Sequence, residues 1–341
     1  MGTAVIGVVA SMNPGAVQSL KSVMDAVAVA MMLLAYCLAI ALGIPYVVRW
    51  LRHRETAAAD SRHPIVGAMY GTFPGGLLVL AAATASVGPL ILPQNVVIAL
   101  IVILAIPGVL AALAISVAFT YHTFTSSDVS VEHVNGGWFI PPVVFILMPM
   151  VLAALLPRAE GETARLLLAG SYAAWGIGFF LFLLVASLFY DRMVLHALPL
   201  APLAPSLWIG LGPLGVGGLA LLRLAQGPAL AVWGEMGAGV QAFSSIVALA
   251  MWGFGLWWMI VAALLLWRYT QRGGIPFGLS WWALIFPLGA YSLSTLSLAR
   301  LWKLQSLEGL GALFALALVL LWLLVAWRTL AGLRSGEVWK R

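Results

Sequence analysis

The chain has 341 residues, of which 63% are hydrophobic and only 8% are charged, and its mean hydropathy is +1.06. A soluble globular domain carries about a quarter charged residues, so this composition excludes one and indicates a chain surrounded by lipid. The formal charge of +6 comes from basic residues at the ends of apolar segments, which does not favour a nucleic-acid partner. The single cysteine, Cys37, excludes an internal disulfide and a cysteine metal site.

Long apolar runs predict an all-α integral membrane protein, because a spanning helix needs roughly 20 apolar residues whereas a barrel strand needs about 10 in alternation. Short connectors make consecutive helices antiparallel neighbours, so we expect residues 1–341 to form a single membrane domain. Hydropathy and turn signals place ten helices at 1–10, 22–50, 64–86, 94–118, 137–157, 163–190, 206–226, 237–267, 277–302 and 308–332.

The first of these helices is too short to cross the membrane. At 1.5 Å per residue, residues 1–12 fall well short of about 30 Å of hydrocarbon. No basic residue precedes the apolar stretch, which argues against a secretory signal peptide. We therefore expect the first helix to be incomplete at its N-terminal end.

Basic residues predict the orientation. Of the 17 Lys and Arg residues, 11 lie in the connectors after the second, sixth and eighth helices or in the C-terminal tail, and 6 lie on the other side. Because cytoplasmic connectors carry the excess of basic residues, we expect the C-terminus in the cytoplasm and the chain in a cell membrane of the bacterial or archaeal type.

The odd-numbered helices contain clusters of glycine and proline near their middles. The prolines of four clusters, Pro74, Pro141, Pro213 and Pro287, follow one another at intervals of 67, 72 and 74 residues. In the first helix, Gly2 and Thr3 stand at the corresponding place. An interval near 70 residues equals two helices, so the repeat predicts five helical hairpins.

The even-numbered helices are bulkier and mostly unbroken, which suits contact with lipid, whereas backbone groups freed by proline need protein or water as partners. We therefore predict an inner ring of five kinked helices around a central pore and an outer ring of five smooth ones. Close packing is the more common reason for any single glycine cluster, and the recurrence is what favours a pore. The residues predicted to line it are Thr3, Thr72, Phe73, Pro74, Phe139, Pro141, Pro142, Gly212, Pro213, Pro287 and Gly289.

Charge indicates how such a pore handles its substrate. No Asp, Glu, Lys or Arg lies near the middle of a predicted helix, whereas proton relays and tightly coupled carriers depend on such residues. Backbone and hydroxyl dipoles remain, which is typical of a channel or a low-affinity transporter. Net positive charge at both ends favours anions, and Arg223 and Arg300, which end the seventh and ninth helices, are the predicted anion vestibule.

Enzymatic chemistry has little support. His122, Asp128, Glu132 and His133 share one connector, but their irregular spacing argues against a metal site. The metalloprotease, hydrolase and nucleotide-binding motifs do not occur, so we expect no catalytic residue, metal or cofactor. A membrane enzyme or an assembly scaffold stays as an unfavoured alternative that would need a convergent polar cluster.

The same motifs resemble the tellurite-resistance/dicarboxylate-transporter family, which includes plant slow anion channels, yeast malate permeases and fungal sulfite exporters. The resemblance covers almost the whole chain, although the family places Met-Gly-Thr within its first helix and this chain begins there. The matching segments are 1–3, 63–64 with 71–75, 137–142, 210–215 and 281–289.

This resemblance implies ten helices in five hairpins about a pore, and a homotrimer with one pore in each subunit. In the family a phenylalanine of the ninth helix plugs the pore, and its place corresponds to Phe286. The expected function is passage of small inorganic or organic acid anions, channel-like or weakly coupled. The alternative is a proton-coupled exporter of a malate-type dicarboxylate or of sulfite, and the sequence leaves the anion itself open.

Overall fold

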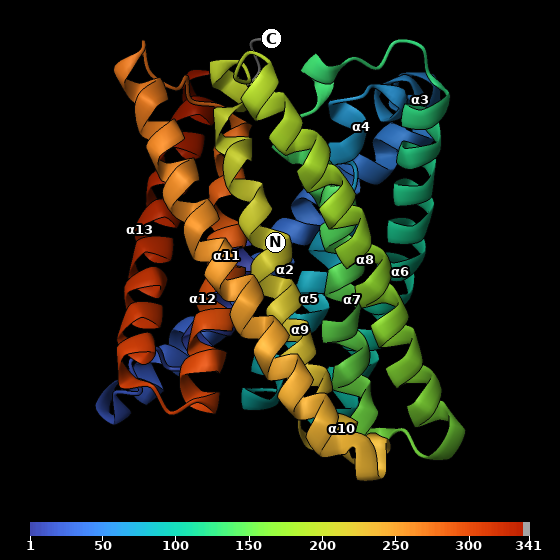
Figure 1. Ribbon diagram of the computed structural model, residues 1–341, viewed down its shortest axis with the longest axis vertical. Coiled ribbons are helices and arrows are strands. Elements are labelled where there is room, and N and C mark those ends of the chain that lie inside the picture. Colours follow the sequence, from blue (N-terminus) through green and yellow to red (C-terminus); the bar gives the residue numbers. More distant parts are fainter. Residues whose placement is uncertain (337–341) are drawn as a thin grey trace.

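A computed structural model describes residues 1–336, and within them the chain is helical with no β-strand. Within residues 1–336, nine helical segments are long and apolar enough to cross a membrane, and α1 is a shorter apolar helix. They stand in one upright bundle, in which the chain begins at mid-height and α1 runs toward the lower end (Figure 1). The main helices are α1 (Gly2–Ser11), α2 (Lys21–Arg52), α5 (Thr72–Val87), α6 (Gln94–Thr125), α7 (Ile140–Leu155), α8 (Gly161–Leu195), α9 (Leu211–Leu224), α11 (Gly237–Gln271), α12 (Ile285–Leu301) and α13 (Gln305–Ser335).

Burial separates these helices into two sets. In the membrane segments that contain α5, α7, α9 and α12, 56–89% of the most apolar 18-residue stretch is buried. In the segments that contain α2, α6, α8, α11 and α13, 17–28% of that stretch is buried. In α1, every residue from Thr3 to Ala10 is buried. We call α1, α5, α7, α9 and α12 the buried helices, and α2, α6, α8, α11 and α13 the exposed helices.

Each buried helix packs against the exposed helix that follows it in the chain. The buried helices also contact one another in succession: α1 contacts α5, α5 contacts α7, α7 contacts α9, α9 contacts α12, and α12 contacts α1. Glycines stand where two of them meet. A Cβ atom on Gly215 of α9 would lie 2.7 Å from the backbone nitrogen of Tyr291 in α12, so the two main chains come very close there.

The glycine-proline clusters break four of the buried helices, as the sequence predicts. A 3₁₀-helix leads into the α-helix in three cases: η4 (Gly136–Phe139) before α7, η6 (Ala201–Gly210) before α9 and η8 (Leu279–Leu284) before α12. The short α4 (Val66–Met69) precedes α5. Pro74, Pro142, Pro213 and Pro287 are each the third residue of the α-helix. Because the first N–H groups of a helix have no partner within it, proline is tolerated there and the helix restarts.

Two short helices lie in segments predicted as connectors. These are α3 (Arg54–Arg62) after α2, and α10 (Gly227–Trp233) before α11. An ion pair joins Arg49 of α2 to Asp60 of α3, and the Tyr70 hydroxyl donates to the carbonyl of Ala57 over 3.2 Å. Five further 3₁₀ turns complete the structure: η1 (Gln18–Leu20), η2 (Gly88–Leu90), η3 (Val131–His133), η5 (Leu156–Arg158) and η7 (Gly234–Met236).

Candidate functional site

Phe286 is the second residue of α12 and is 9% exposed. A Cβ atom on Gly212 of α9 would lie 3.7 Å from Cε1 of its ring and 3.6 Å from Cγ2 of Val143 in α7. The Phe286 ring therefore approaches α9 beside the point where α9 meets α7. Glycine at position 212 leaves room for it.

One face of α9 carries Gly212, which lies beside that ring. Gly215 lies about 60° around the helix from Gly212 and faces Tyr291 of α12. Gly217 lies on the side of α9 away from Gly212 and faces Met251 of the exposed helix α11. The side of α9 that carries Gly212 therefore faces away from α11, between α7 and α12. We call the residues on it the inward face of α9: Gly212, Val216, Leu219 and Arg223.

α12 has a corresponding face. Thr295 accepts a hydrogen bond from the Trp252 indole of α11 over 2.9 Å, and a Cβ atom on Gly289 would meet Val5 of α1. At 100° per residue, Phe286 lies opposite Thr295. Leu293 and Ser297 follow Phe286 at two and three turns and complete the inward face of α12.

Three residues predicted to line a pore instead turn toward exposed helices. The Phe73 ring stacks on Tyr46 of α2, with centroids 4.4 Å apart and planes at 12°. The Phe139 ring lies 5.5 Å from Phe182 of α8, and also 5.5 Å from Phe189. Thr3 accepts a hydrogen bond from the indole of Trp322 in α13 over 3.1 Å. Packing between buried and exposed helices accounts for these side chains, and the structure does not gather them around Phe286.

The other predicted residues lie at or near the helix breaks. Thr72 is exposed and its hydroxyl donates to the carbonyl of Met69 over 2.7 Å. Gly289 lets α12 approach α1, as its contact with Val5 shows. The prolines are buried at the start of their α-helices: Pro74, Pro141, Pro142, Pro213 and Pro287.

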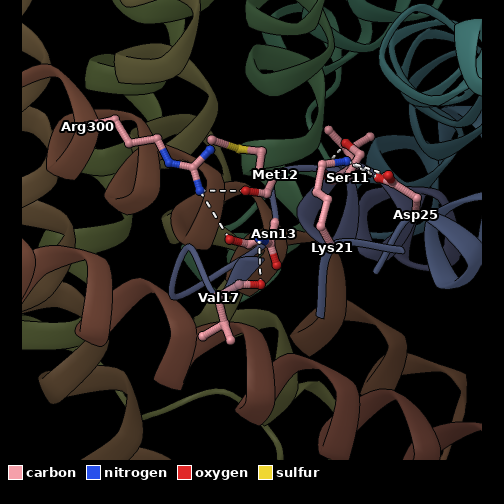
Figure 2. Close-up of polar contacts among 8 residues, drawn as sticks. Ser11, Met12, Asn13, Val17, Lys21, Asp25 and Arg300 are labelled. Carbon is pink, nitrogen blue, oxygen red and sulfur yellow. Dashed lines mark hydrogen bonds and ion pairs between the residues drawn. The ribbon is translucent and has the colours of Figure 1, made fainter. Parts of the chain in front are cut away.

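Arg300 binds the turn that follows α1, where Figure 2 shows its side chain beside Met12 and Asn13. Its Nη2 donates to the carbonyl oxygens of Met12 and Asn13 just after α1, and lies 3.0 Å from Oε1 of Glu308. The same carboxylate accepts from the backbone N–H of Gly15 over 3.1 Å. The Arg300 guanidinium thus donates to free carbonyl groups at the C-terminal end of α1, and the Glu308 carboxylate neutralises its charge. These contacts do not support the predicted place of Arg300 in an anion vestibule.

Arg223 is in a different situation. It is the exposed residue of α9, whose other 13 residues are buried. Within residues 1–336, its side chain makes no hydrogen bond or ion pair. Arg223 is therefore an exposed residue with an unpaired side chain on the inward face of the most buried helix.

The upper end contains a buried arginine that sequence reasoning counted only as a basic residue of a connector. Arg192 of α8 donates from Nη1 to the carbonyls of Glu132 and Val134. The Trp138 indole donates to the carbonyl of Pro64 over 2.9 Å. These bonds fix the segment before α7 against α8 and α4. The described residues hold no group of three potential metal ligands, at His133 or elsewhere.

The chain is similar in sequence to membrane transporters and channels. The profile of the SLAC1 family, described as voltage-dependent anion channel, matches residues 1–330. An uncharacterized transporter of Methanocaldococcus jannaschii is 32% identical over 87% of this chain and 82% of its own length. The sulfite efflux pump of Trichophyton rubrum is 29% identical, over 62% of this chain and 58% of the pump. The malic acid transport protein of Schizosaccharomyces pombe is 20% identical over 65% and 51%.

Proposed function

Since the chain belongs to the SLAC1 family of membrane anion transporters and channels, we propose that it lets small anions pass through a pore between its five buried helices. In this proposal the buried helices form an inner ring, each in a hairpin with the exposed helix that follows it. Phe286 closes the pore at mid-depth. The closed succession of contacts among the buried helices supports the ring.

The position of the Phe286 ring carries the proposal. It stands on the side of α12 opposite Thr295 and against Gly212, where two buried helices meet a third. An aromatic ring in an apolar constriction blocks ions sterically and by excluding water. The break before α12 supplies a joint at which the ring can be displaced, because 3₁₀ geometry changes to α geometry at Ile285.

Passive or weakly coupled passage is favoured over proton-coupled export. The charged residues of the described membrane segments lie near their ends, so no Asp, Glu, Lys or Arg side chain is available at mid-depth to relay a proton. The names of two relatives, a sulfite pump and a malic acid transporter, keep coupled export as the second candidate. Proteoliposomes separate the two, because coupled export requires flux of sulfite or malate to follow an imposed pH gradient.

Replacing Phe286 by alanine tests the gate. We expect Phe286→Ala to raise anion conductance in planar bilayers at least about tenfold, because removing the ring opens the constriction to water. Phe314→Ala is the matched control: that ring is 8% exposed, close to the value for Phe286, but it belongs to α13 and contacts the outer side of α12 at Tyr291. Equal conductance in both variants and the wild type would contradict the proposal.

We also propose a homotrimer with one pore per subunit and a cytoplasmic C-terminus, on the family resemblance and on the distribution of basic residues. Native mass spectrometry of the protein in lipid nanodiscs should give three times 36.2 kDa plus bound lipid. A reporter that is active only in the cytoplasm should be active when it is fused after Arg341. A monomer would contradict the homotrimer. A C-terminal reporter that is active only outside the cell would contradict the cytoplasmic C-terminus.

A further inference from the structure

We infer that Arg223 and Ser297 form an anion-binding site in a vestibule at the lower end of the pore, and that it prefers small oxyanions and carboxylates to halides. This inference rests on the proposed function, because it assigns a role to one mouth of the same pore. It also divides the predicted pair of vestibule arginines, keeping Arg223 and assigning Arg300 to the structure of the turn after α1.

The first argument concerns depth. Arg223 follows Gly212 by 11 residues in α9, and Ser297 follows Phe286 by 11 residues in α12. Eleven residues rise about 16 Å, so both side chains lie roughly half a membrane thickness from the constriction. The two helices run in the same direction and stay in register, since a Cβ atom on Gly218 would lie 3.4 Å from Oγ of Ser294. Arg223 and Ser297 thus reach the same level on neighbouring helices.

The second argument concerns direction. Eleven residues make three turns to within about 20°, so Arg223 points to the same side of α9 as Gly212, and Ser297 to the same side of α12 as Phe286. α11 covers the opposite side of α9, where Gly217 meets Met251 and Gly218 meets Ala248. Both side chains therefore lie on the inward faces, below the Phe286 ring.

The third argument concerns availability. Among residues 1–336, neither the Arg223 guanidinium nor the Ser297 hydroxyl has a hydrogen-bond partner, and Ser297 is half-buried. Two acids near this end are already paired, Glu308 with Arg300 and Asp25 with Lys21. Arg223 thus offers five N–H donors and an unneutralised charge, and Ser297 adds a hydroxyl donor at a similar level on the neighbouring helix.

These properties fix the class of ligand. A guanidinium presents two parallel N–H groups that match two oxygens of one carboxylate or oxyanion, an arrangement that a spherical halide cannot use. The inward residues between Arg223 and Gly212 are Leu219 and Val216, so the α9 side of the stretch between the site and the gate is apolar. A fixed charge at the mouth of a pore raises the local concentration of anions before they enter that stretch.

The experiment measures conductance with the gate opened by Phe286→Ala, in the presence and absence of Arg223→Gln. We expect Arg223→Gln to lower the current carried by nitrate or malate entering from the lower end by about three- to tenfold in 20 mM salt. In 500 mM salt, where screening is strong, the loss should be under about twofold. Chloride current should fall less than nitrate current. Arg223→Lys should keep the charge effect but lose the preference for nitrate over chloride.

Arg165→Gln is the matched control, because it removes the same charge from the same end, at an exposed position in the first turns of α8. Arg165→Gln should leave the current within about 1.5-fold of the current of the Phe286→Ala background. Ser297→Ala should give a smaller loss than Arg223→Gln for nitrate and none for chloride. Equal losses in Arg223→Gln and Arg165→Gln, or no loss in either, would overturn the inference while leaving the gate intact.

A second measurement does not depend on current. In detergent, 10 mM sulfite or malate should raise the melting temperature of the wild type and of Arg165→Gln, and should not raise that of Arg223→Gln, because a ligand that binds only the folded state stabilises it. If Phe286→Ala carries no current but this difference is present, the pore proposal fails and the site stands. If the melting temperatures of the wild type and Arg223→Gln respond alike, the site is overturned.

Discussion

Two glycines, one in a buried helix and one in an exposed helix, have opposite surroundings. Gly215 of α9 stands where the backbone of α12 passes, and a Cβ atom there would lie 2.7 Å from the nitrogen of Tyr291. Gly253 of α11 has no atom within 4 Å of the same position, because it faces away from the bundle. The comparison teaches that glycine is needed where two helices touch, as at Gly215, and is not needed on the outer surface, as at Gly253.

The largest effect should come from enlarging Gly215. Gly215→Leu places a side chain into the backbone of α12, which cannot move without separating two buried helices, so we expect a loss of folding stability above about 3 kcal/mol and little monodisperse protein. Gly253→Leu should stay within about 0.5 kcal/mol of the wild type. Thermal unfolding in detergent, followed by size-exclusion chromatography, measures both. Similar melting temperatures for the two variants would refute the distinction.

A smaller effect separates two phenylalanines that precede or begin broken helices. Phe139 is 2% exposed and packs on two rings of α8, so Phe139→Ala should leave a cavity that costs about 3–5 kcal/mol. Phe286→Ala should cost less, because the ring borders the proposed pore and water can occupy its place. The melting temperatures of the two variants test this order. A lower melting temperature for Phe286→Ala than for Phe139→Ala would place its ring in packing rather than at a gate.

The smallest effect separates the two arginines that end α9 and α12. Arg300→Gln removes donors from the carbonyls of Met12 and Asn13 and leaves Glu308 unpaired, which should cost about 1–3 kcal/mol. Arg223→Gln should change stability by less than about 0.5 kcal/mol, since its side chain is unpartnered. Hydrogen exchange should show faster opening of residues 12–17 in Arg300→Gln alone. Equal exchange rates in both variants would contradict the claim that Arg300, unlike Arg223, holds residues 12–17 in place.

The helices and their breaks were predictable from the sequence because both depend on local properties. Hydropathy fixed the membrane segments to within several residues, and the first helix is short in the structure as in the prediction. Proline marks the helix restarts at Pro74, Pro142, Pro213 and Pro287, since in the first turn of a helix the missing N–H group costs no hydrogen bond. The contrast between small and bulky residues anticipated which helices would be buried.

The direction of each side chain was not predictable, because one residue of helical register turns a side chain by about 100°. Phe73 and Phe286 both precede a proline in similar clusters, yet Phe73 turns to Tyr46 of α2 and Phe286 to Gly212 of α9. Arg300 was grouped with Arg223 for ending a buried helix, and only the fold brings Glu308 and the end of α1 to it. Such contacts join residues far apart in the chain, which no local pattern reveals.

The most direct test of the pore is the accessibility of two opposite positions in α9. Leu219 is on the inward face, between the gate and Arg223, and Leu221 points the other way, toward α11. With Cys37→Ser and Phe286→Ala as the background, a cysteine is placed at one position at a time and treated with a negatively charged methanethiosulfonate reagent. The account predicts rapid loss of anion current for Leu219→Cys and unchanged current for Leu221→Cys. Unchanged current for Leu219→Cys, or equal block of both, would contradict it.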